Sequence, residues 1–310
     1  MQQKKNIHLL ISLTVMVGIT VLIFAFPNIK SNSSIDRDLF QISNLDKIDR
    51  VLLESPKERT DLKFNGTKWM VNGKYEADRQ MITVLFATLK QTVAKRQVAV
   101  HLQDSTQKEI TSHGIKVSCF EAGTLSRAIW VGGNALKTET YFQTKDGKPY
   151  LVSIPGYRVY IGSIFELPSN DWRDKRVFNF NWQNIKSLEV TFPSEPKQNF
   201  KASFKEKFFS IEDISTDTTK LDLFMDALFQ LHSEKILDSL DIKNYKNDLV
   251  QQPLMEIVIQ DVADRSYPLI LFPPDKGSKH LVGKMNDQVV LFNPLALQGI
   301  FRKKEYFVQH

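Results

Sequence analysis

The sequence repeats itself at a nearly constant spacing, and this internal repeat constrains the fold more than any other feature of the chain. From residue 68 onward, matching residues recur 139 positions apart: Lys68 and Lys207, Asp78 and Asp217, Leu89 and Leu228, Pro155 and Pro294. The chain has 310 residues, which is enough for two domains of ordinary size. We therefore expect two tandem domains, formed by residues 44–178 and 179–310.

Each copy contains an aspartate followed by an apolar stripe with helical spacing. The stripes occupy positions i, i+3, i+4 and i+7 and consist of Ile82, Leu85, Phe86 and Leu89 in the first copy and Leu221, Phe224, Met225 and Leu228 in the second. Such spacing is typical of a helix with one buried face. Asp78 and Asp217 stand where an N-cap is expected. The pattern predicts one principal helix in each copy.

The second half of each copy has the alternation and turn signals of short strands. The expected strands are residues 115–119, 128–131, 140–143 and 150–152, and then 255–259, 269–272, 279–282 and 288–292. Gly132 and Gly133 are interpreted as a hairpin turn, although two glycines could also cradle an anion through their N–H groups. Strands, a helix and more strands predict α+β repeats with mostly antiparallel sheets.

A similar segment of aromatic and basic residues ends each copy of the repeat. The first of these closing segments spans residues 172–178 and the second spans residues 301–307, at an offset of 129. Trp172, Arg173 and Arg176 are the candidate partner-binding residues, because an arginine here could clamp an acidic partner. The alternative is an aromatic plug with solvated charges that closes each repeat, and the recurrence favours this closing role.

The N-terminal region contains a long uncharged segment. Residues 7–26 include no Asp, Glu, Lys or Arg, and as a helix they would span roughly 30 Å, the hydrocarbon thickness of a bilayer. We expect residues 1–27 to form a cytoplasmic N-terminus and a transmembrane anchor that contacts the bilayer through residues 7–26. Residues 28–43 would form a polar tether. The fold class expected for the whole chain is this transmembrane helix followed by two α+β repeats.

The orientation of the anchor follows from the charges that precede it. Lys4 and Lys5 come before the apolar segment, so the positive-inside rule places the N-terminus in the cytoplasm and the C-terminal domain outside it. The alternative is a cleaved signal peptide. That alternative usually has a shorter apolar stretch and an Ala-x-Ala-like end, whereas this segment ends in Phe24-Ala25-Phe26-Pro27.

Motifs that carry chemistry are missing from the sequence. A single cysteine allows no intramolecular disulfide and no zinc site that uses two thiolates of this chain. The six histidines show no HExxH spacing, and a P-loop, GxGxxG and GxSxG are all absent. Cys119 alternates with Val117 in an expected strand and is interpreted as a buried apolar side chain. We therefore expect no enzyme, no catalytic residue, no cofactor and no metal.

The net charge of +6 is spread along the chain. A nucleic-acid-binding protein concentrates basic residues on one face or one helix, so we expect no nucleic acid as a partner.

Four segments resemble the DUF4340 family. They read DLFQISNLDKIDRVLLES, KWMVNGKYEAD, ITSHGIKVSCF and NDWRDKRVF, and the resemblance is strongest over residues 38–180. It implies a bacterial envelope protein with an N-terminal membrane segment, hence an inner-membrane location with a periplasmic C-terminal domain. It also implies genes that neighbour those of ABC transporters. Where family members commonly have Gly-Leu-x-x-Pro, this chain has Gly114-Ile115-Lys116-Val117 and lacks the proline.

These observations together predict a membrane-anchored, extracytoplasmic interaction or assembly module with a membrane-protein partner. The resemblance makes an ABC-transporter-type envelope complex the expected assembly. The alternative is an extracytoplasmic protein that binds a small molecule or a glycan between the repeats. A hydrolase ranks third, because the sequence shows no acid–base constellation, although an acid and a base could come from residues distant in the sequence.

Overall fold

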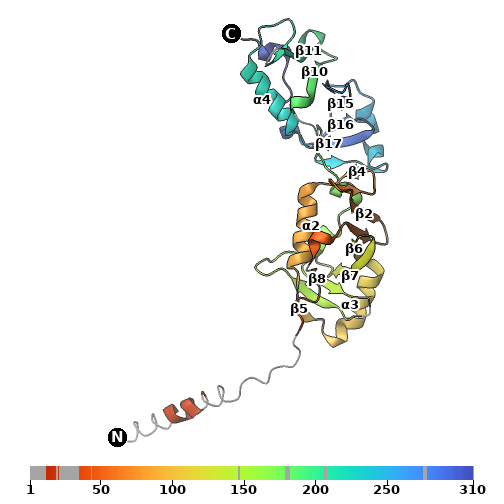
Figure 1. Ribbon diagram of the computed structural model, residues 1–310, viewed down its shortest axis with the longest axis vertical. Helices are drawn as coiled ribbons and strands as arrows, with labels where there is room; N and C mark the ends of the chain where they lie inside the picture. Colours follow the sequence, from red (N-terminus) through yellow and green to blue (C-terminus); the bar gives the residue numbers. More distant parts are fainter. Residues whose placement is uncertain are drawn as a thin grey trace, which may run out of the picture. The chain divides into compact units, whose positions relative to one another are not determined.

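The computed structural model describes residues 12–18, 20, 35–42, 44–145, 147–178, 182–205, 208–274 and 278–309. Two compact units make up the fold. One contains residues 88–114 and 129–162 with the N-terminal region, and the other contains residues 44–87, 115–128 and 163–310. The chain contains two antiparallel sheets (Figure 1).

The first sheet has nine strands in the order β4-β3-β2-β1-β6-β7-β8-β9-β5. Its neighbouring strands pair antiparallel. The strands are β1 (Arg50–Glu54), β2 (Arg59–Phe64), β3 (Trp69–Val71), β4 (Tyr75–Glu76), β5 (Val93–Gln97), β6 (Ile115–Glu121), β7 (Thr124–Gly133), β8 (Thr140–Gln143) and β9 (Tyr150–Ser153).

The second sheet has eight strands in the order β12-β11-β10-β14-β15-β16-β17-β13, and these also pair antiparallel. The strands are β10 (Ile185–Thr191), β11 (Phe200–Lys205), β12 (Phe208–Ile211), β13 (Lys235–Ile236), β14 (Met255–Asp261), β15 (Ser266–Leu271), β16 (Leu281–Met285) and β17 (Gln288–Phe292).

The two sheets share one strand order, and this confirms that the sequence repeat is a structural repeat. Strand β1 lies between β2 and β6, just as β10 lies between β11 and β14. In both sheets the strand that follows the main helix lies at the sheet edge, with β5 beside β9 in the first sheet and β13 beside β17 in the second. Among the described residues, the two-residue strand β4 has no equivalent in the second sheet. The isolated bridge that follows is present in both repeats, between Ala77 and Arg173 in the first and between Thr216 and Val308 in the second.

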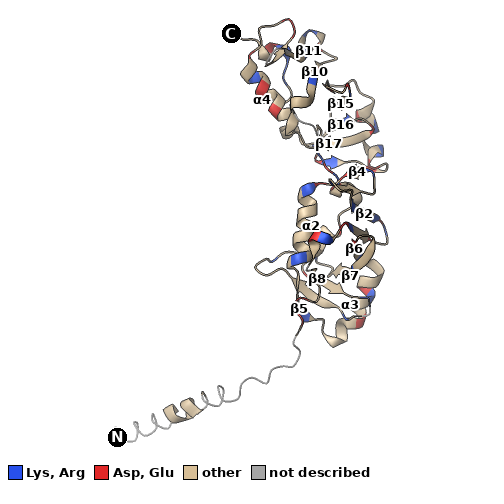
Figure 2. Ribbon diagram, viewed as in Figure 1, with Lys and Arg blue, Asp and Glu red and all other residues tan. Residues whose placement is uncertain are grey.

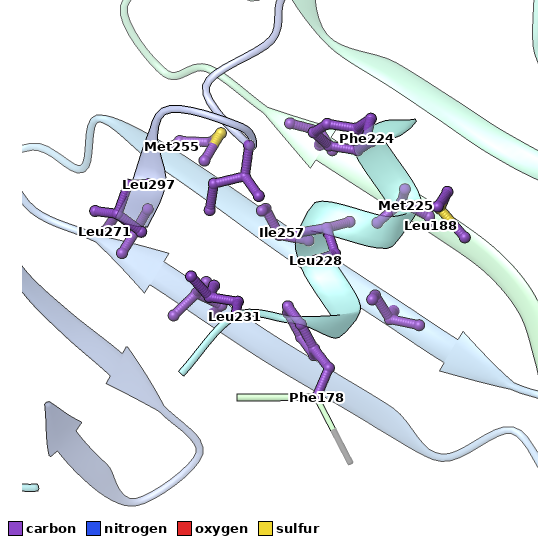
Figure 3. Close-up of a cluster of buried hydrophobic side chains, with 14 of the residues drawn as sticks. Phe178, Leu188, Phe224, Met225, Leu228, Leu231, Met255, Ile257, Leu271 and Leu297 are labelled. Atoms are coloured by element: carbon purple, nitrogen blue, oxygen red, sulfur yellow. The ribbon is translucent and has the colours of Figure 1, made fainter. Parts of the chain in front are cut away.

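The predicted helices are present, and both begin after their aspartates. Helix α2 spans Arg79–Gln91 and α4 spans Thr218–Phe229. Asp217 Oδ1 accepts a hydrogen bond from the Lys220 N–H at 3.1 Å, and Asp78 Oδ1 accepts one from the Met81 N–H at the same distance. In α4 the four predicted core residues are buried (Figure 3).

The expectation of one principal helix per repeat is wrong for the first copy. A second long helix, α3 (Val100–His113), follows β5. Of its side chains only Gln103 and Ile110 are buried, so its sequence has no apolar stripe that would reveal it. The corresponding part of the second copy forms the short segments η6 (Asp241–Tyr245) and α5 (Lys246–Leu249). The remaining 3-10 turns are η1 (Leu45–Lys47), η2 (Ile161–Ile164), η3 (Ser169–Trp172), η4 (Trp182–Asn184), η5 (Pro196–Gln198), η7 (Pro294–Leu297) and η8 (Lys304–Phe307).

The predicted transmembrane helix is corrected by the structure. Within the described residues no helix is both long enough and apolar enough to cross a membrane. Residues 12–18 are helical and exposed, and seven helical residues rise only about 10 Å against a hydrocarbon core of about 30 Å. The rest of the predicted span, except residue 20, lies outside the described residues, as do residues 28–34 and 43 of the predicted tether. The bilayer contact and the localisation that depended on this helix stay predictions.

The glycine pair is also placed differently from the expectation. Gly132 and Gly133 end strand β7, and the turn is formed by the residues that follow, with Asn134 Oδ1 accepting from the N–H groups of Thr138 and Glu139. A Cβ on Gly133 would overlap the side chain of Tyr160, so a larger residue here would require that ring to move. Gly133 therefore packs against this ring and is not part of the turn.

Candidate interaction surface

Backbone hydrogen bonds join the predicted closing segment to the rest of the first repeat. Trp172 ends η3, and its carbonyl accepts a hydrogen bond from the Asp78 N–H at 2.8 Å. In the second repeat the Phe307 carbonyl accepts from the Asp217 N–H at 2.8 Å. Both aromatic side chains are fully buried. The structural equivalent of Trp172 is therefore Phe307, and the sequence alignment that paired Trp172 with Phe301 is wrong.

Two of the three predicted partner-binding residues are buried. Trp172 is 0% exposed and Arg173 is 6% exposed. The Arg173 guanidinium lies 3.4 Å from the ring centroid of Tyr75, and its Nη1 donates to Asn170 Oδ1 at 3.0 Å. Burial lowers the pKa of this guanidinium, an effect that the nearby Tyr75 opposes. These contacts support the closing role for both residues.

Arg176 is the more accessible member of the predicted set, with 41% of its side chain exposed. Its Nε donates to Asp174 Oδ2 at 2.8 Å, and its Nη2 lies 3.8 Å from Glu76 Oε1. The hydrogen bond to Asp174 raises the pKa of the guanidinium. Arg176 therefore already interacts with two carboxylates of its own chain. Its binding of an acidic partner stays a prediction.

The residues around Arg176 are also held by backbone hydrogen bonds. The Val177 N–H donates to the Leu231 carbonyl at 3.0 Å, and the Ser233 N–H donates to the Lys175 carbonyl at 2.8 Å. Asp174 N–H donates to the Glu76 carbonyl at 2.9 Å. Because its backbone forms these hydrogen bonds, the closing segment is a structural element of the fold.

Exposed aromatic side chains gather at the same place in both repeats. Phe64 pairs across the β2–β3 ladder with Trp69, and Phe204 pairs across the β11–β12 ladder with Phe209. The ring centroids are 5.9 Å and 5.4 Å apart. Along each pair of strands, the next cross-strand pair on the same face of the sheet is fully buried. The core face of each sheet therefore extends to the aromatic pair beside the hairpin turn.

The aromatic end of the second repeat is the more exposed one. Phe204 is 56% exposed and Phe208 is 67% exposed, against 38% for Phe64. In the first repeat Trp69 also packs against Phe86 of α2, with 5.2 Å between ring centroids. We call Phe204, Phe208 and Phe209 the hairpin aromatics. The sequence interpretation missed them, although aromatic residues flank the hairpin turn in both copies.

Two of the hairpin aromatics, Phe208 and Phe209, stand on β12, an edge strand that differs from the other three sheet edges. Strands β4 and β13 have only two residues each. Strand β5 carries the exposed Lys95 and Arg96 and a register shift, features that discourage edge-to-edge pairing. Strand β12 has four residues without a charged side chain. It is thus the sheet edge with the most apolar surface to offer.

The groups that could carry chemistry are scattered or inert. Cys119 is 1% exposed on β6, and burial raises the pKa of its thiol to about 12, so the prediction of a buried apolar side chain is confirmed. Ring nitrogens of His113 and His280 lie 3.2 and 3.3 Å from the carboxylates of Glu109 and Glu234. In the part of the chain that the structure describes, no group of three or more His, Cys, Asp or Glu residues could hold a metal ion.

Charged residues of both signs are distributed over the elements of both repeats (Figure 2). This distribution agrees with the mixed surface inferred from the sequence.

Comparisons with known proteins give one match. No curated protein and no solved structure matches the chain significantly. The profile of DUF4340, a domain of unknown function, matches residues 69–250. This range runs from β3 to the residue after α5, so it takes in parts of both repeats and extends beyond the segment of strongest resemblance. On this evidence, the chain belongs to the DUF4340 family.

Proposed function

We propose that this protein is an interaction or assembly module and that the hairpin aromatics form its contact with a partner protein. The observation that carries the proposal is the exposure of Phe208 on the uncharged edge strand β12 and of Phe204 on the neighbouring strand β11. Aromatic residues are enriched in protein interfaces, where a few of them supply most of the binding free energy. The envelope complex of the ABC-transporter type, implied by the resemblance, is the assembly in which we expect this partner.

The repeat supports an interaction role in a second way. The aromatic pair recurs at the equivalent hairpin of the first repeat, although Phe86 partly covers it there. In the second repeat Phe209 is partly buried against the core, whereas Phe204 beside it is 56% exposed. Phe204 is therefore the member of the pair that we assign to the partner.

The test compares two surface variants of the full chain. Phe204→Ser/Phe208→Ser removes two exposed aromatic anchors, whereas Leu223→Ser removes an exposed apolar side chain of α4 that is 61% exposed. Proteins retained by the tagged wild-type chain in its native cells are identified by mass spectrometry, purified and titrated against each variant. We expect the double variant to bind about tenfold more weakly or worse, and Leu223→Ser to bind like the wild type.

Circular dichroism and thermal unfolding of both variants separate binding from folding. If the double variant folds and binds its purified partner as tightly as the wild type does, the hairpin aromatics are not the contact. If the wild-type chain retains no partner that can be reconstituted from purified components, the assembly role itself fails.

A further inference from the structure

Two Asn-Gly dipeptides occupy exposed turns on either side of strand β3. Asn65-Gly66 lies in the turn between β2 and β3, and Asn72-Gly73 lies in the turn between β3 and β4. Gly66 has a φ of 96°, while Asn72 and Gly73 have φ values of 51° and 69°. These left-handed conformations explain why glycine follows asparagine at both turns.

Both glycines lie in open space. A Cβ built on Gly66 or Gly73 would meet no atom within 4 Å, so the space beside both residues is open. Both asparagines are exposed. The two dipeptides differ in how the asparagine side chains are held.

The Asn65 amide is held in a way that favours addition to its carbon. Its Oδ1 accepts hydrogen bonds from the N–H groups of Thr67 and Lys68 at 3.1 and 3.0 Å. When a nucleophile adds to Cγ, negative charge develops on Oδ1, and two preorganised backbone donors stabilise that charge. The donors come from the same short turn, so they stay in place while the side chain reacts.

The Asn72 amide is tied to two other elements of the fold. Its Oδ1 accepts from the Asp61 N–H of β2 at 2.8 Å, and its Nδ2 donates to Ser169 Oγ of η3 at 3.3 Å. The nitrogen that would leave is therefore hydrogen-bonded, and Oδ1 has one backbone donor where that of Asn65 has two. Reaction at Asn72 must break contacts with both β2 and η3.

We propose that Asn65 is a site of spontaneous deamidation in the native protein and that the fold protects Asn72. The Gly66 nitrogen loses its proton to solvent and bonds to Asn65 Cγ, and Nδ2 leaves as ammonia, which closes a succinimide ring. Water then opens either carbonyl of the ring and yields aspartate or isoaspartate. The isoaspartate product inserts an additional methylene into the main chain of the turn, between the paired residues Phe64 and Trp69.

The experiment follows both dipeptides in one sample of the full-length protein. The protein is held in mildly alkaline buffer, digested at intervals and analysed by mass spectrometry, with isoaspartate distinguished by its chromatographic retention. We expect Asn65 to be converted about tenfold faster than Asn72 in the native protein. In denaturant, where both dipeptides lose their hydrogen bonds, we expect the two rates to converge.

A variant tests the protection of Asn72 directly. Ser169→Ala removes the acceptor of Asn72 Nδ2 and leaves the Asn65 turn untouched. We expect conversion at Asn72 to accelerate and conversion at Asn65 to remain unchanged. Equal native rates at the two sites, or faster conversion at Asn72, would overturn the proposal. An unaltered Asn72 rate in a folded Ser169→Ala variant would overturn the assigned cause of its protection.

Discussion

At the residue scale, buried polar groups show how the repeats differ. Asp261, at the end of β14, is 1% exposed. Its carboxylate accepts hydrogen bonds from the Ala263 and Arg265 N–H groups, from Arg265 Nε at 2.7 Å and from the Tyr267 hydroxyl at 3.1 Å. The corresponding turn of the first repeat, between β6 and β7, has Ala122 and Gly123 at positive φ, and the turn of the second repeat has Asp264 at positive φ. The second repeat adds the buried carboxylate of Asp261 to this backbone conformation.

Asp261 makes the stability of the second repeat depend on pH. Burial alone would raise the pKa of its carboxyl group, but the hydrogen bonds from Arg265, Tyr267 and Ala263 outweigh burial and lower the pKa. A carboxyl group with a lowered pKa contributes stability above the ordinary aspartate pKa and loses that contribution as the pH falls through its own lower pKa. We expect Asp261→Asn to be less stable than the wild type at neutral pH.

The difference between Asp261→Asn and the wild type should shrink as the pH falls below the ordinary range of aspartate. Urea unfolding at several pH values measures it. Asp264→Asn serves as the control, because Asp264 is exposed and bonded to Lys186 on the surface. A stability difference that does not change with pH would show that the charge of Asp261 is not what stabilises the turn.

At the element scale, the main helices were predictable and α3 was not. An N-cap aspartate and an apolar stripe are local signals, so the sequence contains everything needed to place α2 and α4. Helix α3 buries only Gln103 and Ile110 and has no side-chain N-cap, so it lacks the local signals that mark α2 and α4 and depends on tertiary contacts. Tertiary contacts of this kind leave no periodic pattern.

The candidate surface escaped prediction for a related reason. Phe204 and Phe208 look like core residues in the sequence, because an aromatic residue in a strand is usually buried. Only the sheet order shows that β12 is an edge strand and that these rings extend beyond the core. Conversely, Trp172 and Arg173 resembled a binding patch and prove to be buried.

The N-cap of α4 has a predictable energetic contribution. Asp217→Ala removes the acceptor of the Lys220 N–H, and we expect the free energy of unfolding to fall by about 1 kcal/mol. Asp217→Asn keeps an acceptor oxygen and should lose less. Asp222→Ala, on the exposed side of the same helix, changes charge without touching the cap and should be close to neutral. Equal losses for Asp217→Ala and Asp222→Ala in urea unfolding would count against the cap.

At the scale of the whole molecule, the repeat is exact in strand order and approximate in sequence spacing. The offset is 139 at the N-cap aspartates and 135 at the closing aromatics, as the hydrogen bonds of Trp172 and Phe307 show. The sequence alignment paired Trp172 with Phe301 because Phe301 also begins a run of aromatic and basic residues. Burial separates the two candidates, since Phe307 is 0% exposed while Phe301 is only partly buried.

The closing aromatics should therefore matter equally in the two repeats. Trp172→Ala and Phe307→Ala each empty a fully buried site, and we expect each to cost about 3–5 kcal/mol. Trp172→Phe should cost less, because phenylalanine fills most of the site and removes the indole N–H, which has no hydrogen-bond partner. Phe301→Ala should be milder than Phe307→Ala.

Hydrogen exchange locates these effects. Trp172→Ala should increase exchange at the start of α2, and Phe307→Ala should increase it at the start of α4, because each aromatic residue bonds the N-cap aspartate of its own repeat. If Phe301→Ala loosens α4 and Phe307→Ala does not, the equivalence derived from the backbone is wrong.

The position of Trp172 ahead of the second sheet also bears on the order of events during synthesis on the ribosome. The first repeat is complete once η3 has left the exit tunnel, and the strands of the second sheet, which begin at Ile185, emerge only afterwards. Two sheets with the same strand order could exchange strands if they formed together, a characteristic failure of multidomain and repeat proteins. Because the closing residue precedes the second copy, the growing chain can finish one sheet before any competing strand exists.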